Sequence, residues 1–269
     1  MIIAFLNSLI AQAPYYYSGA NDFYNTAPGA MGSMYNGVTL IGLGIMLVTM
    51  LIGGAVQAGL KNAFARYSEE AAPLTGAEVA RRMLHQYGLD DVQVISTKGR
   101  LTDHYNPLDR TVNLSESVYN EASVAAMAVA AHECGHAVQH AHAYPWLGLR
   151  SSLVPMVNIG SRLGQVILTI GLLLLAAGSG TTVAWVGLAL YATTTVFALV
   201  TLPVEFDASR RALDWIEQSG WASRAMHGQA GTALRWAAMT YVAAALSSLA
   251  MLLYYALIIL SRMNHDNRE

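Results

Sequence analysis

Four long apolar runs divide the chain. A helix needs about 20 apolar residues to cross the ~30 Å hydrocarbon core of a bilayer, and residues 37–60 and 236–260 meet this requirement without a charged side chain. Residues 163–204 form a longer uncharged run, which is enough for two spans. Residues 178–182 interrupt that run with the turn-forming sequence GSGTT. The pattern predicts four transmembrane helices, of which the second and third form a hairpin.

The segment between the first two runs is polar and mixed in pattern. Thr75 and Glu78 have the spacing of a capping box, and apolar residues at helical spacing follow them up to Gly88, a typical helix stop. Alternating residues and turn signals then predict β structure, and an Ala-rich stretch predicts a long helix. The expected strands cover residues 91–96, 101–105 and 110–114, and the expected helix covers 121–142.

These elements predict a mainly α integral membrane protein with about four transmembrane helices and an α+β domain. A further helix is expected to begin at Leu202, where the chain leaves the hairpin. The expected order is an interfacial N-terminal segment, a first span, a polar segment, the hairpin, a second polar segment, a last span and a tail. The bounds of these parts are 1–36, 37–60, 61–162, 163–203, 204–235, 236–261 and 262–269.

The composition agrees with a membrane protein and narrows the possible chemistry. Hydrophobic residues make up 54% of the chain and charged residues 12%, whereas soluble proteins carry about 25% charged residues. The formal net charge of −2 provides no basic excess to neutralise phosphates, which argues against a nucleic-acid partner. The single cysteine, Cys134, excludes an internal disulfide and a multi-cysteine metal site.

Lysine and arginine are unevenly distributed around the apolar runs. The two polar segments, 61–162 and 204–235, hold 13 of the 15 basic residues. Four spans place these two segments on the same side of the membrane. The positive-inside rule therefore predicts that both are cytoplasmic and that both chain termini lie outside.

The Ala-rich helix carries the strongest chemical signal, the sequence HECGH at 132–136. Residues four apart lie about 5–6 Å from each other on one helix face, so His132 and His136 can bind one Zn²⁺ together. Glu133, beside the first histidine, can act as the base that takes a proton from the attacking water. His140 lies about 12 Å along the helix axis from His132 and is expected near the site rather than on the metal. Cys134 is expected to be a small buried residue.

A third ligand is expected after the hairpin. Glu205 and Asp207 are the first acids after the uncharged run, and a carboxylate at a membrane boundary is costly unless it is paired or metal-bound. Asp207 has a potential partner in Arg211, four residues further on, whereas Glu205 has no basic residue three or four positions ahead. Glu205 is therefore the predicted third ligand, and Asp207 is the alternative.

Further polar residues are candidates for the surroundings of the metal or for substrate binding. Asp103 and His104 form a pair that either lines the site or stabilises its own turn. The anionic oxygen formed during peptide hydrolysis needs a stabilising donor. The candidates for this role are His104, Tyr105, His227 and Arg210.

Several stretches resemble the YugP-type bacterial membrane zinc metallopeptidases, also called neutral zinc metallopeptidase family 2. They are LTDHYNP (101–107), LSE (114–116), VAAHECGHAVQH (129–140), LRSS (149–152), VTLPVEFDASRRAL (200–213) and AAMTYVAAA (237–245). More distantly, the chain is similar to the HtpX type of integral-membrane protease. In that type an Asp follows the Glu ligand by four residues, whereas Ser209 stands at this position here.

The resemblance implies a zinc-dependent endopeptidase of the gluzincin type in the bacterial inner membrane, with a zincin-like domain facing the cytoplasm. It implies one Zn²⁺ per chain, bound by His132, His136 and Glu205, with Glu133 as the catalytic base. The implied partners are the lipid bilayer and polypeptide substrates, especially membrane-associated proteins. The alternative is a non-catalytic membrane scaffold or partner-binding protein with a structural zinc site, for which four protein ligands are expected.

Overall fold

The structure is a computed structural model that describes residues 30–99 and 101–266. The chain forms two compact units. The helical unit comprises Met1–Gly54, Pro155–Ala198 and Ala243–Glu269, and the α/β unit comprises Ala55–Val154 and Leu199–Val242. Most of the interfacial segment expected over 1–36 and the last three residues of the tail lie outside the described residues.

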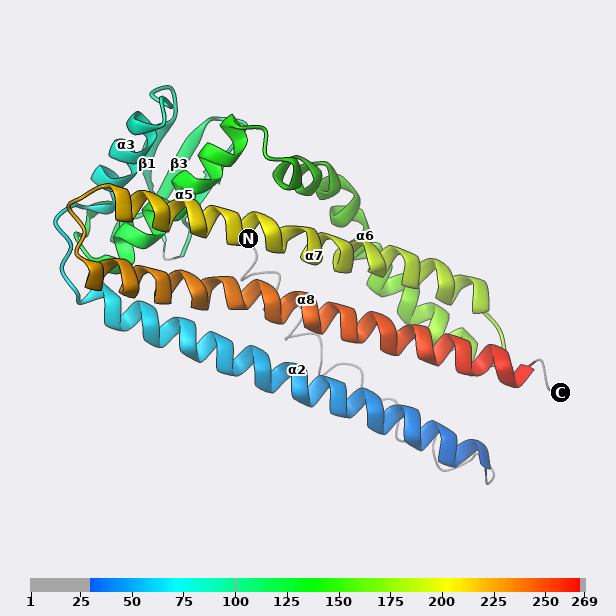
Figure 1. Ribbon diagram of the computed structural model, residues 1–269. Coiled ribbons are helices and arrows are strands. Elements are labelled where there is room, and N and C mark those ends of the chain that lie inside the picture. Colours follow the sequence, from blue (N-terminus) through cyan, green and yellow to red (C-terminus); the bar gives the residue numbers. More distant parts are fainter. Residues whose placement is uncertain (1–29, 100, 267–269) are drawn as a thin grey trace. The chain divides into compact units, whose positions relative to one another are not determined.

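Four long helices contain the apolar runs (Figure 1). They are α2 (Ala30–Ser68), α6 (Pro145–Ala176), α7 (Thr181–Gln218) and α8 (Arg224–Asp266). All four are long and apolar enough to cross a membrane. The prediction of a mostly helical chain with four such helices is therefore confirmed.

The long helices extend beyond the expected spans. In particular, α7 continues through Pro203 to Gln218, so the prediction of a separate helix starting at Leu202 is wrong. Proline removes one backbone donor from a helix, but membrane helices tolerate this loss. The consequence is that Glu205 lies in the interior of a helix rather than in a first turn.

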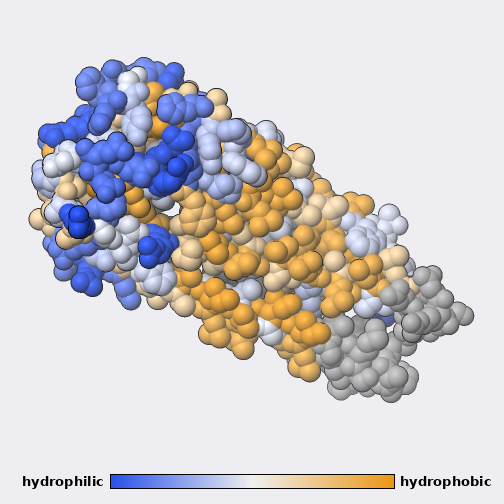
Figure 2. Space-filling model, in the orientation of Figure 1, coloured by the Kyte–Doolittle hydropathy of each residue, from blue (hydrophilic) through white to orange (hydrophobic). Residues whose placement is uncertain are grey.

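In the helical unit, α6 and α7 pack closely through glycine residues. A Cβ atom on Gly171 would lie 2.4 Å from the backbone nitrogen of Ala184, and one on Gly187 would lie 2.4 Å from Cα of Leu168. The two backbones therefore approach at a distance that only glycine allows at these positions. The buried apolar cluster of this unit is formed by Leu168, Leu175, Ala184, Leu188, Tyr191 and Ile259. Figure 2 shows hydrophobic side chains, in orange, over the surface of the long helices.

The α/β unit contains a three-stranded sheet with the order β1-β3-β2. Strand β3 (Thr111–Ser115) is central and buried, and it pairs in parallel with β1 (Gln93–Thr97) and antiparallel with β2 (His104–Asn106). Strand β2 is shorter than the stretch expected over 101–105. Leu101 has a φ of 58°, so the chain turns at this residue and the strand begins only at His104.

Three shorter helices complete this unit. They are α3 (Gly76–Gln86), α4 (Glu116–Asn120) and α5 (Val124–Ala141). The predicted capping box is confirmed, because the side chain of Thr75 accepts from the backbone of Glu78 and the carboxylate of Glu78 accepts in return. The long helix expected from residue 121 begins three residues later, because Ser123 caps it by accepting a hydrogen bond from the backbone of Ala126.

Helix α5 contacts α7 within the core of the α/β unit. A Cβ atom on Gly135 would lie 2.5 Å from the carbonyl oxygen of Ala208. Around this contact, apolar side chains from α3, β3, α5 and α7 are fully buried, among them Val79, Met83, Val112, Leu114, Met127 and Ile216. Gly135, at the fourth position of the HECGH motif, thereby lets the two histidines approach the helix that carries Glu205.

Candidate metal centre

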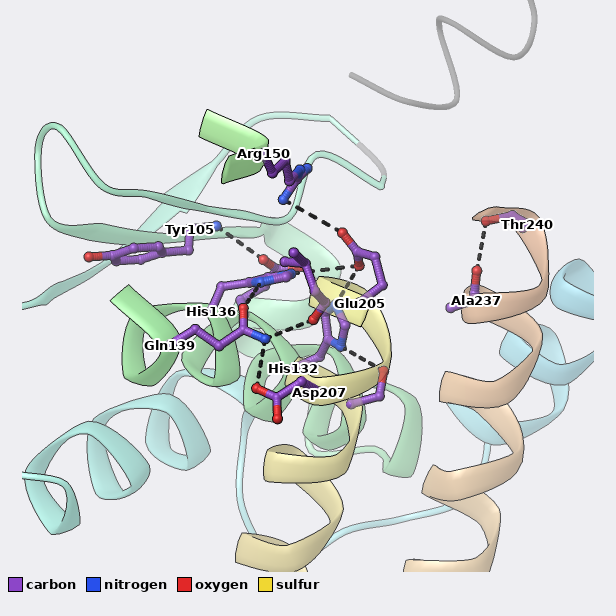
Figure 3. A network of polar contacts seen from close by, with 12 residues as sticks. Tyr105, His132, His136, Gln139, Arg150, Glu205, Asp207, Ala237 and Thr240 are labelled. Carbon is purple, nitrogen blue, oxygen red and sulfur yellow. Dashed lines mark hydrogen bonds and ion pairs between the residues drawn. The ribbon is translucent and has the colours of Figure 1, made fainter. Parts of the chain in front are cut away.

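Two histidines from α5 and one glutamate from α7 meet in the interior of the α/β unit (Figure 3). Ligand atoms of His132, His136 and Glu205 all lie within 4.8 Å of one another. Oε2 of Glu205 is 3.3 Å from Nε2 of His132 and 3.7 Å from Nε2 of His136. The side chains of the two histidines are 13% and 11% exposed and that of Glu205 only 3%. Glu205, rather than Asp207, therefore stands beside the histidine pair.

The donor set fits a zinc ion. Among the described residues, Oε2 of Glu205 is buried without a hydrogen-bond partner, and an unpaired buried carboxylate oxygen is costly. Two imidazole nitrogens face the same point, and two histidines with one glutamate form a known ligand set of catalytic zinc. A divalent cation bound by these three atoms would remove the cost of burying Oε2.

Gln139 fixes the ring of His136. Its side-chain nitrogen donates to the carbonyl oxygen of Val204 at 2.8 Å and to the carboxylate of Asp207 at 2.9 Å. Both of these partners can only accept, so the amide orientation of Gln139 is determined and its oxygen faces Nδ1 of His136 at 3.0 Å. Nδ1 must then donate, which leaves the Nε2 lone pair of His136 free for a metal.

Ser209 makes the matching contact with His132. Its hydroxyl lies 3.1 Å from Nδ1 of His132, so this ring too has Nδ1 paired and Nε2 turned toward Glu205. Ser209 therefore makes a neutral contact with the ring of His132.

Glu133 lies beside the metal-ligand group and is held by the sheet. Its Oε2 accepts a hydrogen bond of 3.0 Å from the backbone N–H of Tyr105 in β2. Burial, together with the charges of Glu205 and Asp103, raises the pKa of Glu133 to about 7 against the opposing effects of His132 and of the hydrogen bond from Tyr105. Glu133 therefore lies within electrostatic reach of the ligand group while its carboxylate is oriented by a backbone donor.

The other predicted residues take up supporting positions. Asp103 accepts hydrogen bonds from the backbone and hydroxyl of Ser115, which ties the chain before β2 to the end of β3. Nδ1 of His104 donates to the carbonyl of Thr102 at 2.7 Å. His140 pairs through Nδ1 with the hydroxyl of Tyr105 at 2.8 Å.

Asp207, the alternative candidate for the third ligand, is paired with other side chains. Asp207 receives the guanidinium groups of Arg210 and Arg211 in addition to the amide of Gln139. The side chain of Arg210 is 65% exposed, so its described contact is with Asp207 and not with the ligand group. Cys134 is buried, as predicted, and its thiol donates weakly to the carbonyl of Ala80.

Sequence reasoning assigned no role at the site to four residues that contact the ligand group. Gln139 and Ser209 hold the histidines, while Arg150 and Tyr241 both contact Glu205. Gln139 follows His136 by three residues and Ser209 follows Glu205 by four, which are spacings that put side chains on one helix face. A tyrosine hydroxyl in an apolar helix needs a polar partner, which is the signal that Tyr241 offered.

Two comparisons with known proteins gave a match. The family described as "Putative neutral zinc metallopeptidase" matches residues 43–260. A Bacillus subtilis protein named "Putative membrane protease YugP" is 43% identical over 207 residues, which cover 76% of this chain and 90% of that protein. No solved structure matches the chain.

Proposed function

Because the chain belongs to the family of putative neutral zinc metallopeptidases, we propose that it is a membrane-embedded zinc endopeptidase. It hydrolyses peptide bonds of proteins at or near the membrane, and its site binds one Zn²⁺ per chain. The observation that carries the proposal is that Oε2 of Glu205 is buried without a hydrogen-bond partner among the described residues and faces two oriented imidazoles. An interior acceptor of this kind is suited to a cation.

Each residue of the site has a proposed role in hydrolysis. His132, His136 and Glu205 hold the metal, which when bound supplies a Lewis acid for the scissile carbonyl and acidifies the attacking water. Glu133 accepts the proton of that water and passes it to the nitrogen of the leaving amine. The Tyr105 backbone N–H holds the Glu133 carboxylate in place for both transfers.

The proposed fold type and orientation follow from the same elements. A His-Glu-x-x-His helix with a glutamate ligand on a later helix is the gluzincin arrangement, and the small sheet beside α5 is compatible with a zincin-like domain. The excess of basic residues in the polar segments supports a cytoplasmic site. With four helices suited to spanning a membrane, we place the enzyme in the bacterial inner membrane.

The competing function is a scaffold with a structural zinc ion. Structural zinc sites are closed by four protein ligands, whereas catalytic sites use three and keep one position open. Among the described residues, the group that could hold a metal has three members, His132, His136 and Glu205. This count favours a hydrolase.

Activity and metal content of the full chain in detergent test the proposal together. We expect about one zinc per chain, casein cleavage that stops on chelation and returns with zinc, and a Glu133→Gln variant that keeps its zinc. Loss of the base should lower turnover by about 10²–10⁴-fold. Glu217→Gln, at an exposed position of α7, is the matched control and should cleave like wild type. Undiminished cleavage by Glu133→Gln would refute the assignment of the base.

A further inference from the structure

We propose that Arg150 and Tyr241 are positioning residues that hold Glu205 as a single-oxygen metal ligand. Arg150 lies beside Oε1 of the carboxylate and Tyr241 interacts with the same carboxylate, which leaves Oε2 for the metal. The inference rests on the proposed function, because it concerns the same metal site. It adds a device that keeps one coordination position of the metal open.

We call the contacts of Arg150 and Tyr241 with the Glu205 carboxylate the clamp, and Arg150 supplies its charged half. It lies in the part of α6 that belongs to the α/β unit, and Nη1 is 3.7 Å from Oε1 of Glu205 (Figure 3). The Arg150 side chain is only 20% exposed. Within residues 30–99 and 101–266, this ion pair is the polar contact found for its guanidinium. A mostly buried cation with one anionic neighbour fixes the position of that neighbour.

Tyr241 supplies the directional half. Its hydroxyl, from α8, interacts with the Glu205 carboxylate. We assign this interaction to Oε1, because Oε2 faces the two histidine Nε2 atoms and has no hydrogen-bond partner within the described part of the chain. Oε1 thus receives a cation and a hydroxyl, while Oε2 faces the two Nε2 atoms.

The asymmetry has a consequence for coordination. A carboxylate can bind a metal through one oxygen or through both, and the second oxygen would occupy a position that a catalytic zinc reserves for water or substrate. With Oε1 engaged by Arg150 and Tyr241, rotation of the carboxylate into a two-oxygen mode has to break both contacts. The clamp therefore favours three protein donor atoms and one open position.

Spectroscopy of the cobalt-substituted full chain tests the clamp, since Co²⁺ absorbs visible light more strongly when four-coordinate than when five- or six-coordinate. The variants are Arg150→Met, Tyr241→Phe and the two combined. The matched controls are Arg162→Met, an exposed position of α6, and Tyr119→Phe, whose hydroxyl accepts a hydrogen bond from Arg81. X-ray absorption of the zinc form counts the oxygen neighbours independently.

We expect the wild type and both controls to be four-coordinate. The combined variant should gain one oxygen neighbour and lose visible absorption, and casein turnover should fall about tenfold or more, while its metal content stays near one per chain. Each single variant should show part of this change, so the test survives poor folding of the combined variant. An absorption spectrum and an oxygen count unchanged in all three variants would overturn the clamp.

The outcomes also separate the two proposals. If the Arg150 and Tyr241 variants show the predicted spectral changes relative to Co²⁺-bound wild type, but wild type cleaves no protein, the clamp stands and the proposed function fails. If wild type is a zinc-dependent protease and the Co²⁺ spectrum is the same in the Arg150 and Tyr241 variants as in wild type, the function stands and the clamp fails.

Discussion

The helical unit and the α/β unit satisfy their polar side chains in different ways. In the helical unit, hydroxyls mostly bond to carbonyls of their own helix, as Thr169, Thr193 and Thr194 do. In the α/β unit, Gln139 and Ser209 bond to groups more than 60 residues away in sequence. A hydroxyl bonded within its own helix places no demand on its neighbours, whereas a bond between elements fixes their register.

This difference indicates which part of the molecule tolerates change. The helical unit needs apolar volume and a few glycines, so many sequences satisfy it. The metal site needs particular donors and acceptors in fixed directions, and removing one leaves another buried polar group unpaired. Substitutions of similar size should therefore alter metal binding in the α/β unit but only stability in the helical unit.

The largest effect is expected from removal of the Glu205 carboxylate. Glu205→Ala leaves two histidine ligands, so bound zinc should fall from about one per chain to well below that value, with protease activity falling in parallel. Metal analysis of the detergent-purified variant measures this. Glu217→Ala on the exposed face of α7 serves as control. Full zinc occupancy in Glu205→Ala would assign the third ligand elsewhere.

A pair of glycine substitutions contrasts the two units directly. In Gly135→Ala the new methyl would lie 2.5 Å from the Ala208 carbonyl, and in Gly187→Ala it would lie 2.4 Å from Cα of Leu168. The first should separate α5 from α7 and weaken zinc binding. The second should lower thermal stability but leave the zinc affinity of the folded protein unchanged. Equal loss of zinc affinity in both variants would contradict the comparison.

Those features of the fold and of the site that depend on local patterns could be predicted from the sequence. Long apolar runs, the capping box at Thr75 and the i, i+4 histidines are local patterns, so the four helices and the motif helix could be read directly. Glu205 stood out because an acid after a long uncharged run demands a partner. Its role as a ligand stays a prediction, although the structure brings it to the histidines.

The sequence could not predict the register between elements that are far apart in the chain. The pairing of Gln139 with Asp207 and of Ser209 with His132 depends on how α5 lies against α7, which no local pattern encodes. The wrong helix start at Leu202 has a related cause. Pro203 and the acids after it look like a helix N-terminus, but the continuous packing of α7 outweighs that local signal.

A moderate effect is expected at Gln139. Gln139→Leu removes the acceptor of His136 Nδ1 and leaves Asp207 without its amide donor. Loss of a group that orients a metal-bound histidine typically lowers metal affinity 10–100-fold, and we expect a change of this size. Competition titration with a zinc chelator measures it. Gln93→Leu, an exposed position in β1, is the control. Wild-type affinity in Gln139→Leu would show that the amide does not orient the ring.

A smaller effect is expected at Ser209. The hydroxyl makes one neutral contact with His132, so Ser209→Ala should weaken zinc binding by about tenfold or less. Ser209→Asp should instead strengthen binding, because a carboxylate makes a charge-assisted hydrogen bond to the ring. The same titration distinguishes the two variants. Tighter binding by Ser209→Ala than by wild type would rule out this orienting role.

The smallest effect is expected in the helical unit, at its one described hydroxyl pair between helices. Thr195 on α7 lies 2.7 Å from the Ser248 hydroxyl on α8, and both residues are buried. Hydrogen bonds between membrane helices contribute about 0.6 kcal/mol on average, because unfolded helices in a membrane also find partners. Thr195→Val keeps the shape of the side chain and should reduce the free energy of unfolding by about this amount, without changing zinc affinity. A loss several times larger, measured by denaturation in detergent, would mean that polar contacts specify the helical unit as strictly as they specify the metal site.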